Sequence, residues 1–480
     1  MFDIDWQSVL GQLAYDPKNP MIFSTGVFLL LFLGFTLIYN LLGKKTTLRL
    51  LFVTAFSYYF YYKSSGFYFY LLFIVTFSDF FLAWLIHRNN QRHGLTTEEA
   101  VAKRKLGVNR LLLALSLMVD LGILVYFKYT NFFGNCWANI TGGTWDMLDI
   151  ILPVGVSFFP QLVAGPIVRA SDFIPQIRKP LFVSKEMFGR AIFLIMAGLI
   201  KKAIIADYIS VNFVDRVFDQ PDLYSGVENL LGIYAYTLQL YCDFSGYSDM
   251  AIGIALMLGF KFPKNFDAPF KSQSITEFWR RWHISLSFWL RDYIYISFGG
   301  NRHGLFRQCI NLLLVMVIGG FWHGADFNFI LWGTFMGVCL VVEKLFMVWR
   351  RKSHPDYRIT NHSHGLGGFV RTLITFHLFA ASLIYFRASS FEVGTTMIDQ
   401  IFNNFTPQVF TQWITGYWGV AVLIVIGYIS HYLPSRMNDA VQGGITKMPL
   451  FFQALLIAIV IFAVIQMKSA DVQPFIYFDF

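Results

Sequence analysis

Long apolar runs alternate with short polar segments along almost the whole chain. A run of about 20 apolar residues can cross a bilayer as a helix. The pattern therefore predicts an all-α, multi-pass integral membrane protein of about ten spans, with additional re-entrant or interfacial helices. The predicted spans are Met21–Gly43, Leu50–Tyr62, Phe67–Ile86, Leu111–Phe127, Phe188–Ala206, Leu230–Phe260, Ile310–Phe335 with its continuation to Val348, Phe369–Tyr385, Tyr417–Tyr432 and Phe451–Met467.

The chain shows no internal repeat and no low-complexity linker. We therefore predict one domain over residues 1–480, in which residues 1–20 form a polar N-terminal segment before the first span. Lys44 and Lys45 follow the first predicted span, and Arg88 follows the third. Basic loops stay on the cytoplasmic side, so the N-terminus is expected on the outer face.

Composition supports the membrane interpretation and excludes a nucleic-acid partner. The chain is 56% hydrophobic and only 14% charged, whereas soluble domains carry about 25% charged residues. Its net charge of +9 comes from basic residues in loops between the apolar runs, where they determine topology. Membrane lipid is thus the predicted surrounding, and no nucleic-acid binding is expected.

The first candidate site residue is His323, in the segment Gly319-Gly-Phe-Trp-His-Gly-Ala-Asp326. Between Ile310 and Phe335 only His323 and Asp326 are ionisable. An ionisable group within a span costs roughly 2.5–3.5 kcal/mol, so it indicates a functional site by default. Histidine is well suited to proton transfer near neutral pH. The alternative is a histidine that only hydrogen-bonds a neighbouring helix.

The second candidate segment is Ser274–Asp292. Ser274 and Glu277 have the spacing of a capping box, so a helix is expected to begin here and to continue as one amphipathic helix. Its expected apolar face comprises Phe278, Trp282, Leu286, Trp289 and Tyr293, while Arg280, Ser287 and Arg291 lie opposite and His283 lies at the edge. Such a helix either anchors the surface to lipid, or uses Arg280, Arg281 and Arg291 to bind a phosphorylated ligand while His283 faces an interior chamber.

Two carboxylates, Asp243 and Asp249, lie in the apolar segment Tyr241-Cys-Asp-Phe-Ser-Gly-Tyr-Ser-Asp249. They are expected to play a structural polar role, by accepting hydrogen bonds from neighbouring helices or by holding an arginine. No metal site is expected, because the histidines of the polar loop, His354, His362 and His364, do not have a metal-binding spacing.

Several motifs together resemble the membrane-bound O-acyltransferase family. They are Gln161-Leu-Val-Ala-Gly-Pro166, Tyr241–Asp249, Phe278-Trp-Arg-Arg-Trp-His-Ile-Ser-Leu-Ser287 and Gly320-Phe-Trp-His-Gly324. Leu290-Arg-Asp-Tyr, Gly299-Gly-Asn-Arg302 and Gln473-Pro-Phe-Ile-Tyr-Phe478 resemble its alginate O-acetylation branch. The related teichoic-acid D-alanylation branch shares the two histidine motifs.

This resemblance implies acyl transfer across a bacterial inner membrane. His323 matches the catalytic histidine, which would act as the base, and His283 matches a second important position. The donor implied is acetyl-CoA, with no bound cofactor, and the acceptor is an exported polysaccharide served by a periplasmic acetyltransferase partner. Asp326 is a candidate to orient the His323 ring, if both lie on one helical face. The alternatives are D-alanyl or other acyl transfer to a cell-wall polymer, or a transporter or proton relay.

The chain departs from the family pattern at Leu152–Pro166. Two motifs that are normally separate run together here, as though a segment near Val154–Pro160 had been lost. Pro153, Pro160 and Pro166 prevent a regular helix in what remains. Because a lost membrane segment exposes apolar surface and unpaired backbone groups, we predict lower stability and weaker acyl transfer than in a full-length relative.

Overall fold

The computed structural model of the chain consists of helices, with no strand in the residues that it describes. Those residues are 11–17, 19–43, 45–94, 107–145, 158–162, 165–179, 181–360 and 362–467. The all-α prediction is thereby confirmed. Most of the junction Leu152–Pro166, half of the polar N-terminal segment and the motif Gln473–Phe478 lie outside the described residues.

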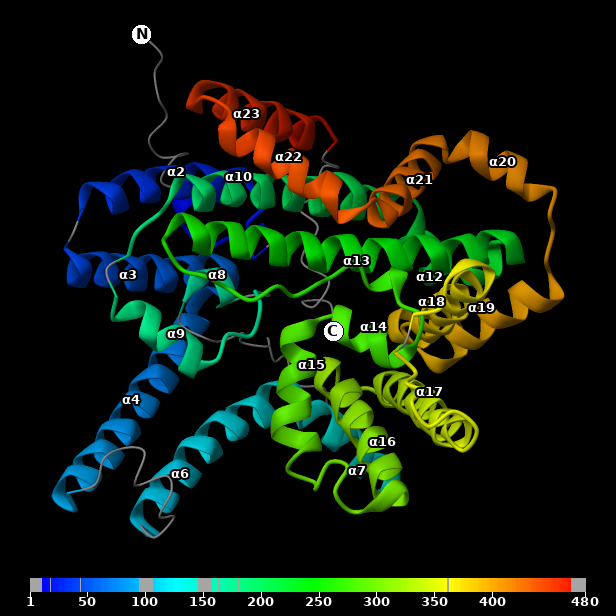
Figure 1. Cartoon of the computed structure of the whole chain (residues 1–480), viewed down its shortest axis with the longest axis horizontal. Helices are drawn as coiled ribbons and strands as arrows, with labels where there is room; N and C mark the ends of the chain where they lie inside the picture. Colours follow the sequence, from blue (N-terminus) through cyan, green and yellow to red (C-terminus); the bar gives the residue numbers. More distant parts are fainter. Residues whose placement is uncertain are drawn as a thin grey trace. The chain divides into compact units, whose positions relative to one another are not determined.

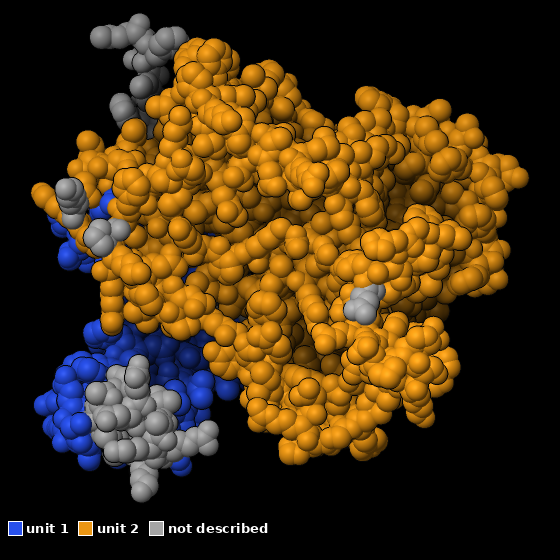
Figure 2. All heavy atoms as spheres, viewed as in Figure 1, with its two compact units in different colours: residues 1–21, 47–163 blue, residues 22–46, 164–480 orange. Residues whose placement is uncertain are grey.

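The chain forms two compact units, which Figure 2 distinguishes by colour. Unit 1 comprises residues 1–21 and 47–163, and unit 2 comprises residues 22–46 and 164–480. The single domain expected over residues 1–480 stays a prediction. All the candidate site residues named from the sequence belong to unit 2.

Unit 1 contains long apolar helices. They are α3 (Thr46–Ser65), the 3-10 turn η1 (Gly66–Tyr68), α4 (Phe69–Arg92), α6 (Gly107–Leu124), the π-helical η2 (Val125–Tyr129), α7 (Thr130–Thr141) and α8 (Phe159–Leu162). The α4 and α6 helices pack together, and side-chain hydrogen bonds join them. The Asn109 side chain accepts a hydrogen bond from Asn89 at 2.8 Å and donates one to Asn90 at 2.6 Å.

Unit 2 contains the remaining helices. They are α2 (Gly26–Leu41), α9 (Ala170–Ile177), α10 (Lys185–Leu199), η3 (Ile200–Ala206), α11 (Asp207–Ile209), η4 (Ser210–Val214), α12 (Asp215–Asp219), η5 (Pro221–Leu223), α13 (Gly226–Met257), η6 (Pro269–Lys271), α14 (Ile275–Arg281), α15 (Ile284–Leu290), η7 (Arg291–Tyr295), α16 (Gly304–His323), α17 (Phe327–Arg351), α18 (Gly365–Arg387), α19 (Phe391–Asn403), α20 (Val409–Gly416), α21 (Trp418–Tyr432), α22 (Ser435–Lys447) and α23 (Leu450–Met467).

The core of unit 2 forms around α13, a buried helix of 32 residues. Figure 1 shows α10 running along α13, and η3, α18, α19 and α21 also pack against it. Glycines permit this close approach. A Cβ on Gly246 would lie 2.8 Å from the carbonyl oxygen of Gly198, and a Cβ on Gly253 would lie 2.8 Å from that of Ala191. Small residues at such contacts are typical of helix packing in membranes.

Helices α16 and α17 form an antiparallel hairpin with equally close packing (Figure 1). A Cβ on Gly320 would lie 2.2 Å from the carbonyl oxygen of Phe329, and one on Gly333 would lie 2.3 Å from that of Met316. The backbones therefore touch across the hairpin, and this contact fixes where the residues at its closed end lie.

The structure supports a multi-pass membrane protein, but the predicted number of about ten spans is not confirmed. Within the described residues, six helical segments are long and apolar enough to cross a bilayer, or seven if α20 and α21 count as one span bent by 90°. These six are Thr46–Arg92, Gly107–Thr141, Gly304–His323, Phe327–Arg351, Gly365–Arg387 and Leu450–Met467. The predicted spans Phe188–Ala206 and Leu230–Phe260 are helical but do not belong to this set, because polar and charged residues interrupt them.

Candidate active site

His323 is the last residue of α16 and lies at the closed end of the α16–α17 hairpin. The helix stops there because Gly324 adopts an extended conformation. Asp326 then begins α17 as its N-cap, and its carboxylate accepts a hydrogen bond from the backbone N–H of Asn328 at 2.8 Å. His323 and Asp326 therefore do not share a helical face, which was the condition for the expected orienting role. In this structure Asp326 caps a helix.

Aromatic rings surround the His323 side chain, which is only 6% exposed. The Trp332 ring stands perpendicular to it, with ring centres 5.2 Å apart. Trp322 and Phe386 lie at 5.0 Å and 5.3 Å, both edge-to-face. These rings leave the imidazole little contact with water, and a ring nitrogen of a neutral imidazole could accept a proton.

A cavity of about 820 Å³ runs beside α16 and α17 and reaches His323. From α16 it is lined by Gln308, Leu312, Met316, Gly319 and His323, which recur at helical spacing and so share one face. The helical rise from Gln308 to His323 is roughly 22 Å. The volume is typical of a small-molecule site, and the length suits an extended ligand rather than a compact one.

The cavity lining is cationic at the end that lies away from His323. Lys344 and Arg351 of α17 line it together with Arg358 of the loop that follows. Arg280 of α14 and Arg291 of η7 also line it. Among the described residues, no carboxylate forms an ion pair with any of these cations except Arg291, which pairs with its neighbour Asp292. Cations without acidic partners beside a cavity can bind an anionic ligand.

Arg281, the third arginine singled out from the sequence, lies elsewhere. Its Nε is 2.9 Å from Glu277, and its Nη1 donates to the backbone oxygen of Asp267 at 3.1 Å. Arg281 is not among the described residues that line the cavity. The sequence did not show that Arg280 lines the cavity whereas Arg281 does not. It also did not distinguish Lys344, which lines the cavity, from the basic residues that determine topology. Lys344 did carry a usable signal, because it is ionisable and interrupts an apolar run.

The expectation of one continuous amphipathic helix over Ser274–Asp292 is wrong. Ser274 does cap α14, whose Glu277 N–H donates to the Ser274 hydroxyl at 3.1 Å, but α14 ends at Arg281. His283 then adopts a left-handed conformation with φ +41°, and α15 begins after it. The break has a non-local cause. The backbone oxygen of Asn265 accepts the Ile284 N–H at 2.9 Å, so the chain bends around the Asn265 segment.

Asn265 also holds the His283 side chain. The His283 Nδ1 lies 3.1 Å from the Asn265 side-chain oxygen, which also accepts a hydrogen bond from the Ser285 hydroxyl at 2.9 Å. His283 is 3% exposed, and burial lowers its pKa to about 3. It is not among the described residues that line the cavity. The Trp322 ring contacts both histidines, at 6.3 Å from His283 and 5.0 Å from His323.

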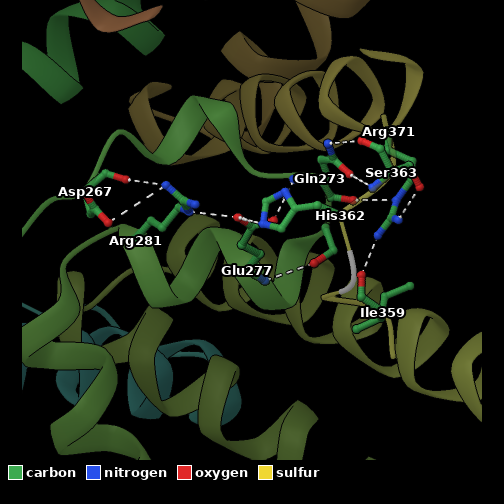
Figure 3. Close-up of polar contacts among 9 residues, drawn as sticks. Asp267, Gln273, Glu277, Arg281, Ile359, His362, Ser363 and Arg371 are labelled. Atoms are coloured by element: carbon green, nitrogen blue, oxygen red, sulfur yellow. Dashed lines mark hydrogen bonds and ion pairs between the residues drawn. The ribbon is translucent and has the colours of Figure 1, made fainter. Parts of the chain in front are cut away.

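A polar latch joins the loop after α17 to the start of α14 (Figure 3). The Gln273 side chain donates to the Ser363 backbone oxygen at 2.9 Å and accepts from the Ser363 N–H at 2.8 Å. Arg371 of α18 donates to the Gln273 and Ile359 backbone oxygens. Because Arg358 and Ile359 line the cavity, the latch fixes the position of its cationic end.

Asp243 and Asp249 bind lysines of η3 rather than an arginine. Lys202 Nζ lies 2.5 Å from Asp243 and 2.7 Å from Asp207, and Lys201 Nζ lies 2.7 Å from Asp249. Lys202 is 1% exposed, and a buried ammonium group needs such carboxylate partners. Sequence reasoning missed both lysines, although they lie within the predicted span Phe188–Ala206, near its end. Among the described residues, no group of three or more His, Cys, Asp or Glu side chains could hold a metal ion.

The sequence of the chain was compared with protein families and with known proteins. Residues 48–387 match the family described as MBOAT, membrane-bound O-acyltransferase family. The chain is 33% identical to the probable alginate O-acetylase AlgI of Pseudomonas putida, over 96% of this chain and 100% of that protein. It is 34% identical to the peptidoglycan O-acetyltransferase of Helicobacter pylori, over 59% of this chain and 63% of that protein. It is 30% identical to the teichoic acid D-alanyltransferase of Bacillus subtilis, over 49% of this chain and 61% of that protein.

The alignment with the Pseudomonas putida protein extends over 522 positions, more than the 480 residues of this chain. That relative therefore has residues with no counterpart here. The shortening inferred near Val154–Pro160 lies partly outside the described residues, and its effect on stability and activity stays a prediction.

Proposed function

This chain belongs to the membrane-bound O-acyltransferase family, and we propose that it transfers acetyl groups from acetyl-CoA for the O-acetylation of an exported bacterial polysaccharide. It is a multi-pass membrane protein and an acyltransferase. The proposal adds the donor, the acceptor, the catalytic base and a location in the bacterial inner membrane. One observation carries it: a single cavity connects a cationic mouth to the buried His323.

The donor is proposed from the charge and length of the cavity. Acetyl-CoA has a polyanionic nucleotide at one end and a thioester at the other, joined by a long flexible arm. Lys344, Arg351 and Arg358 suit the phosphates, and Leu312 and Met316 suit the arm. Because α16 and α17 are antiparallel, the beginning of α16, with Arg307, and the end of α17, with Arg351, lie on the same side of the membrane. Basic ends stay cytoplasmic, so the donor enters from the cytoplasm.

The reaction at His323 follows from acyl-transfer chemistry. The acceptor hydroxyl oxygen attacks the thioester carbon, and a His323 ring nitrogen takes the hydroxyl proton. The carbon–sulfur bond then breaks, and the leaving thiolate receives the proton back from the imidazolium, so the histidine is neutral again. A positioned base of this kind contributes about 10²–10⁴-fold to the rate. The buried aromatic surroundings keep water from competing with the acceptor.

The acceptor and partner are proposed from the relatives. The Pseudomonas putida relative is named for alginate and the Helicobacter pylori relative for peptidoglycan, both carbohydrate polymers. We propose a polysaccharide hydroxyl on the outer side, reached directly or through a periplasmic acetyltransferase partner. D-alanyl transfer to a cell-wall polymer is less favoured, because the Bacillus subtilis relative aligns with 49% of this chain, against 96% for the probable alginate O-acetylase. A transporter or proton relay is also less favoured, because the matching family is described as one of acyltransferases.

The test is acetyl release from labelled acetyl-CoA by the protein in membrane vesicles. His323→Gln and His323→Ala should both abolish transfer to the polymer, while donor binding and the amount of folded protein stay normal. His354→Gln, which changes an exposed loop histidine, is the matched control and should retain activity. Continued transfer by the His323→Gln variant would exclude the catalytic role.

The same assay also tests whether acetyl-CoA is the donor. If the unaltered protein hydrolyses or transfers nothing from acetyl-CoA, but does so from an acyl carrier protein, the donor proposal is wrong. If both histidine variants are absent from the membrane, then His323 serves folding rather than catalysis.

A further inference from the structure

We propose that the indole N–H groups of Trp332 and Trp279 stabilise the negative charge that develops on the thioester carbonyl oxygen during acyl transfer. This inference rests on the proposed function and assigns two further catalytic residues to it. No sequence motif assigned them a role. Their position in the cavity and their hydrogen-bonding state carry the inference.

Both indole nitrogens are buried, and no described protein atom accepts a hydrogen bond from either of them. Trp332 as a whole is only 4% exposed. Buried N–H groups are nearly always paired, because an unpaired donor loses its hydration without compensation. Trp279 and Trp332 both line one cavity, so an acceptor atom that arrives there with a substrate would provide the missing partner.

Both tryptophans line the cavity at its His323 end. The Trp332 and His323 ring centres are 5.2 Å apart with an interplanar angle of 88°. The Trp279 and Trp332 ring centres are 5.9 Å apart with an angle of 79°. All three residues contribute to the lining of the same cavity. The proposal therefore requires that, when a thioester lies within reach of the His323 base, the two indole rings turn their N–H groups toward its carbonyl oxygen.

The helices that carry the two indoles are held to each other by Glu343 of α17. Its carboxylate accepts hydrogen bonds from the backbone N–H of Thr276 at 2.9 Å and of Ile275 at 2.5 Å, at the start of α14. These bonds anchor the helix of Trp279 to the helix of Trp332. Donors fixed in this way need little reorganisation when charge appears, and this is the condition for strong oxyanion stabilisation.

The chemistry is balanced without a further reactant. Attack by the acceptor hydroxyl converts the carbonyl carbon to a tetrahedral centre and places a negative charge on its oxygen, while His323 holds the proton. The two indole N–H groups donate to that oxygen and remain neutral. When the carbon–sulfur bond breaks, the carbonyl re-forms, the hydrogen bonds weaken, and the thiolate takes the proton from His323.

The experiment compares tryptophan-to-phenylalanine variants of the full-length protein in vesicles, with acetyl-CoA as the donor. Trp332→Phe and Trp279→Phe keep an aromatic ring and remove the N–H. Each should lower kcat by about 10²-fold, the typical effect of removing one oxyanion donor, while the donor KM changes little. The matched control is Trp413→Phe, because the Trp413 indole nitrogen is also buried without a described acceptor, but it lies in α20 outside the cavity lining. This control should retain full activity.

A second variant separates the lost N–H from the changed ring shape. Replacement of Trp332 by benzothienylalanine, in which sulfur takes the place of the N–H, should lower kcat as much as Trp332→Phe does. Near-normal kcat in this isostere or in both phenylalanine variants would overturn the inference and leave the proposed function intact. Absence of acetyl transfer by the unaltered protein would instead refute the proposed function.

Discussion

Substitution of Gly333 by alanine tests whether the α16–α17 contact positions His323, the proposed catalytic base. A Cβ at Gly333 would lie 2.3 Å from the carbonyl oxygen of Met316 and 3.2 Å from the Cα of Gly320. The obstructing atoms are backbone atoms of the facing helix, so no side-chain rotation relieves the clash. The helices must therefore move apart by about 1 Å to restore ordinary van der Waals contact.

The size of the effect follows from this geometry. Overpacking of a tight contact costs about 1–3 kcal/mol, because the surrounding side chains leave their preferred positions. Gly333 is adjacent to Trp332, and Gly320 is three residues before His323, so the displacement reaches both. A shift of about 1 Å in catalytic geometry can lower the rate by about 10²-fold. We expect Gly333→Ala to lower both the melting temperature and the rate of acetyl transfer.

Two measurements check this expectation: thermal unfolding in detergent and acetyl transfer in vesicles. Gly444→Ala is the matched control, because Gly444 is also helical and a Cβ there meets no atom within 4 Å. In a helix this control should be neutral or stabilising by up to about 1 kcal/mol. If Gly333→Ala melts and turns over like the control, the helices are not in backbone contact and the argument fails.

Further predictions concern the second histidine and the donor end of the cavity. The pKa of His283 is lowered to about 3 in the folded state, so its contribution to stability is complete above pH 6.5 and declines as the pH falls from 6.5 toward 3. The stability of His283→Gln should thus fall less steeply over this range in thermal unfolding, and equal slopes would contradict the assignment. Arg358→Gln should raise the KM for acetyl-CoA about tenfold or more, whereas Arg350→Gln, outside the described cavity lining, should not; equal KM values would exclude a phosphate contact. Gln273→Ala should release the latch and raise the same KM with kcat unchanged, and an unaltered KM would show that the latch does not position Arg358.

Sequence patterns predicted the helical class and the segment that contains His323, because hydrophobic periodicity and a misplaced ionisable residue are local signals. The break at His283 could not be predicted in this way. Ser274 and Glu277 correctly indicated where α14 begins, but the end of α14 depends on Asn265, which is remote from it in the sequence. A local pattern contains no information about such a partner.

The cationic residues of the cavity were likewise predicted only in part from the sequence. Arg280 and Arg291 were named from the sequence and line the cavity, whereas Arg281, at the adjacent position, is held by Glu277. The cations of α17 and of its following loop were missed, since nothing in the sequence brings Arg358 close to α14. That proximity depends on the latch through Gln273, a contact between residues 90 positions apart.

The α16–α17 hairpin has two roles, helix packing and cavity lining, and each role belongs to a different face. Its inner face carries Gly320 and Gly333, and it determines how closely the helices approach. Its other face carries His323, Trp332 and Lys344, and it lines the cavity from the reacting end to the cationic region. A change on the inner face therefore alters stability and catalysis together, because it moves both helices. A change of a lining side chain alters catalysis or donor binding alone, because the backbone contact is preserved. Comparing the two classes of variant thus distinguishes the residues that contact the substrate from the residues that hold those contacting residues in position.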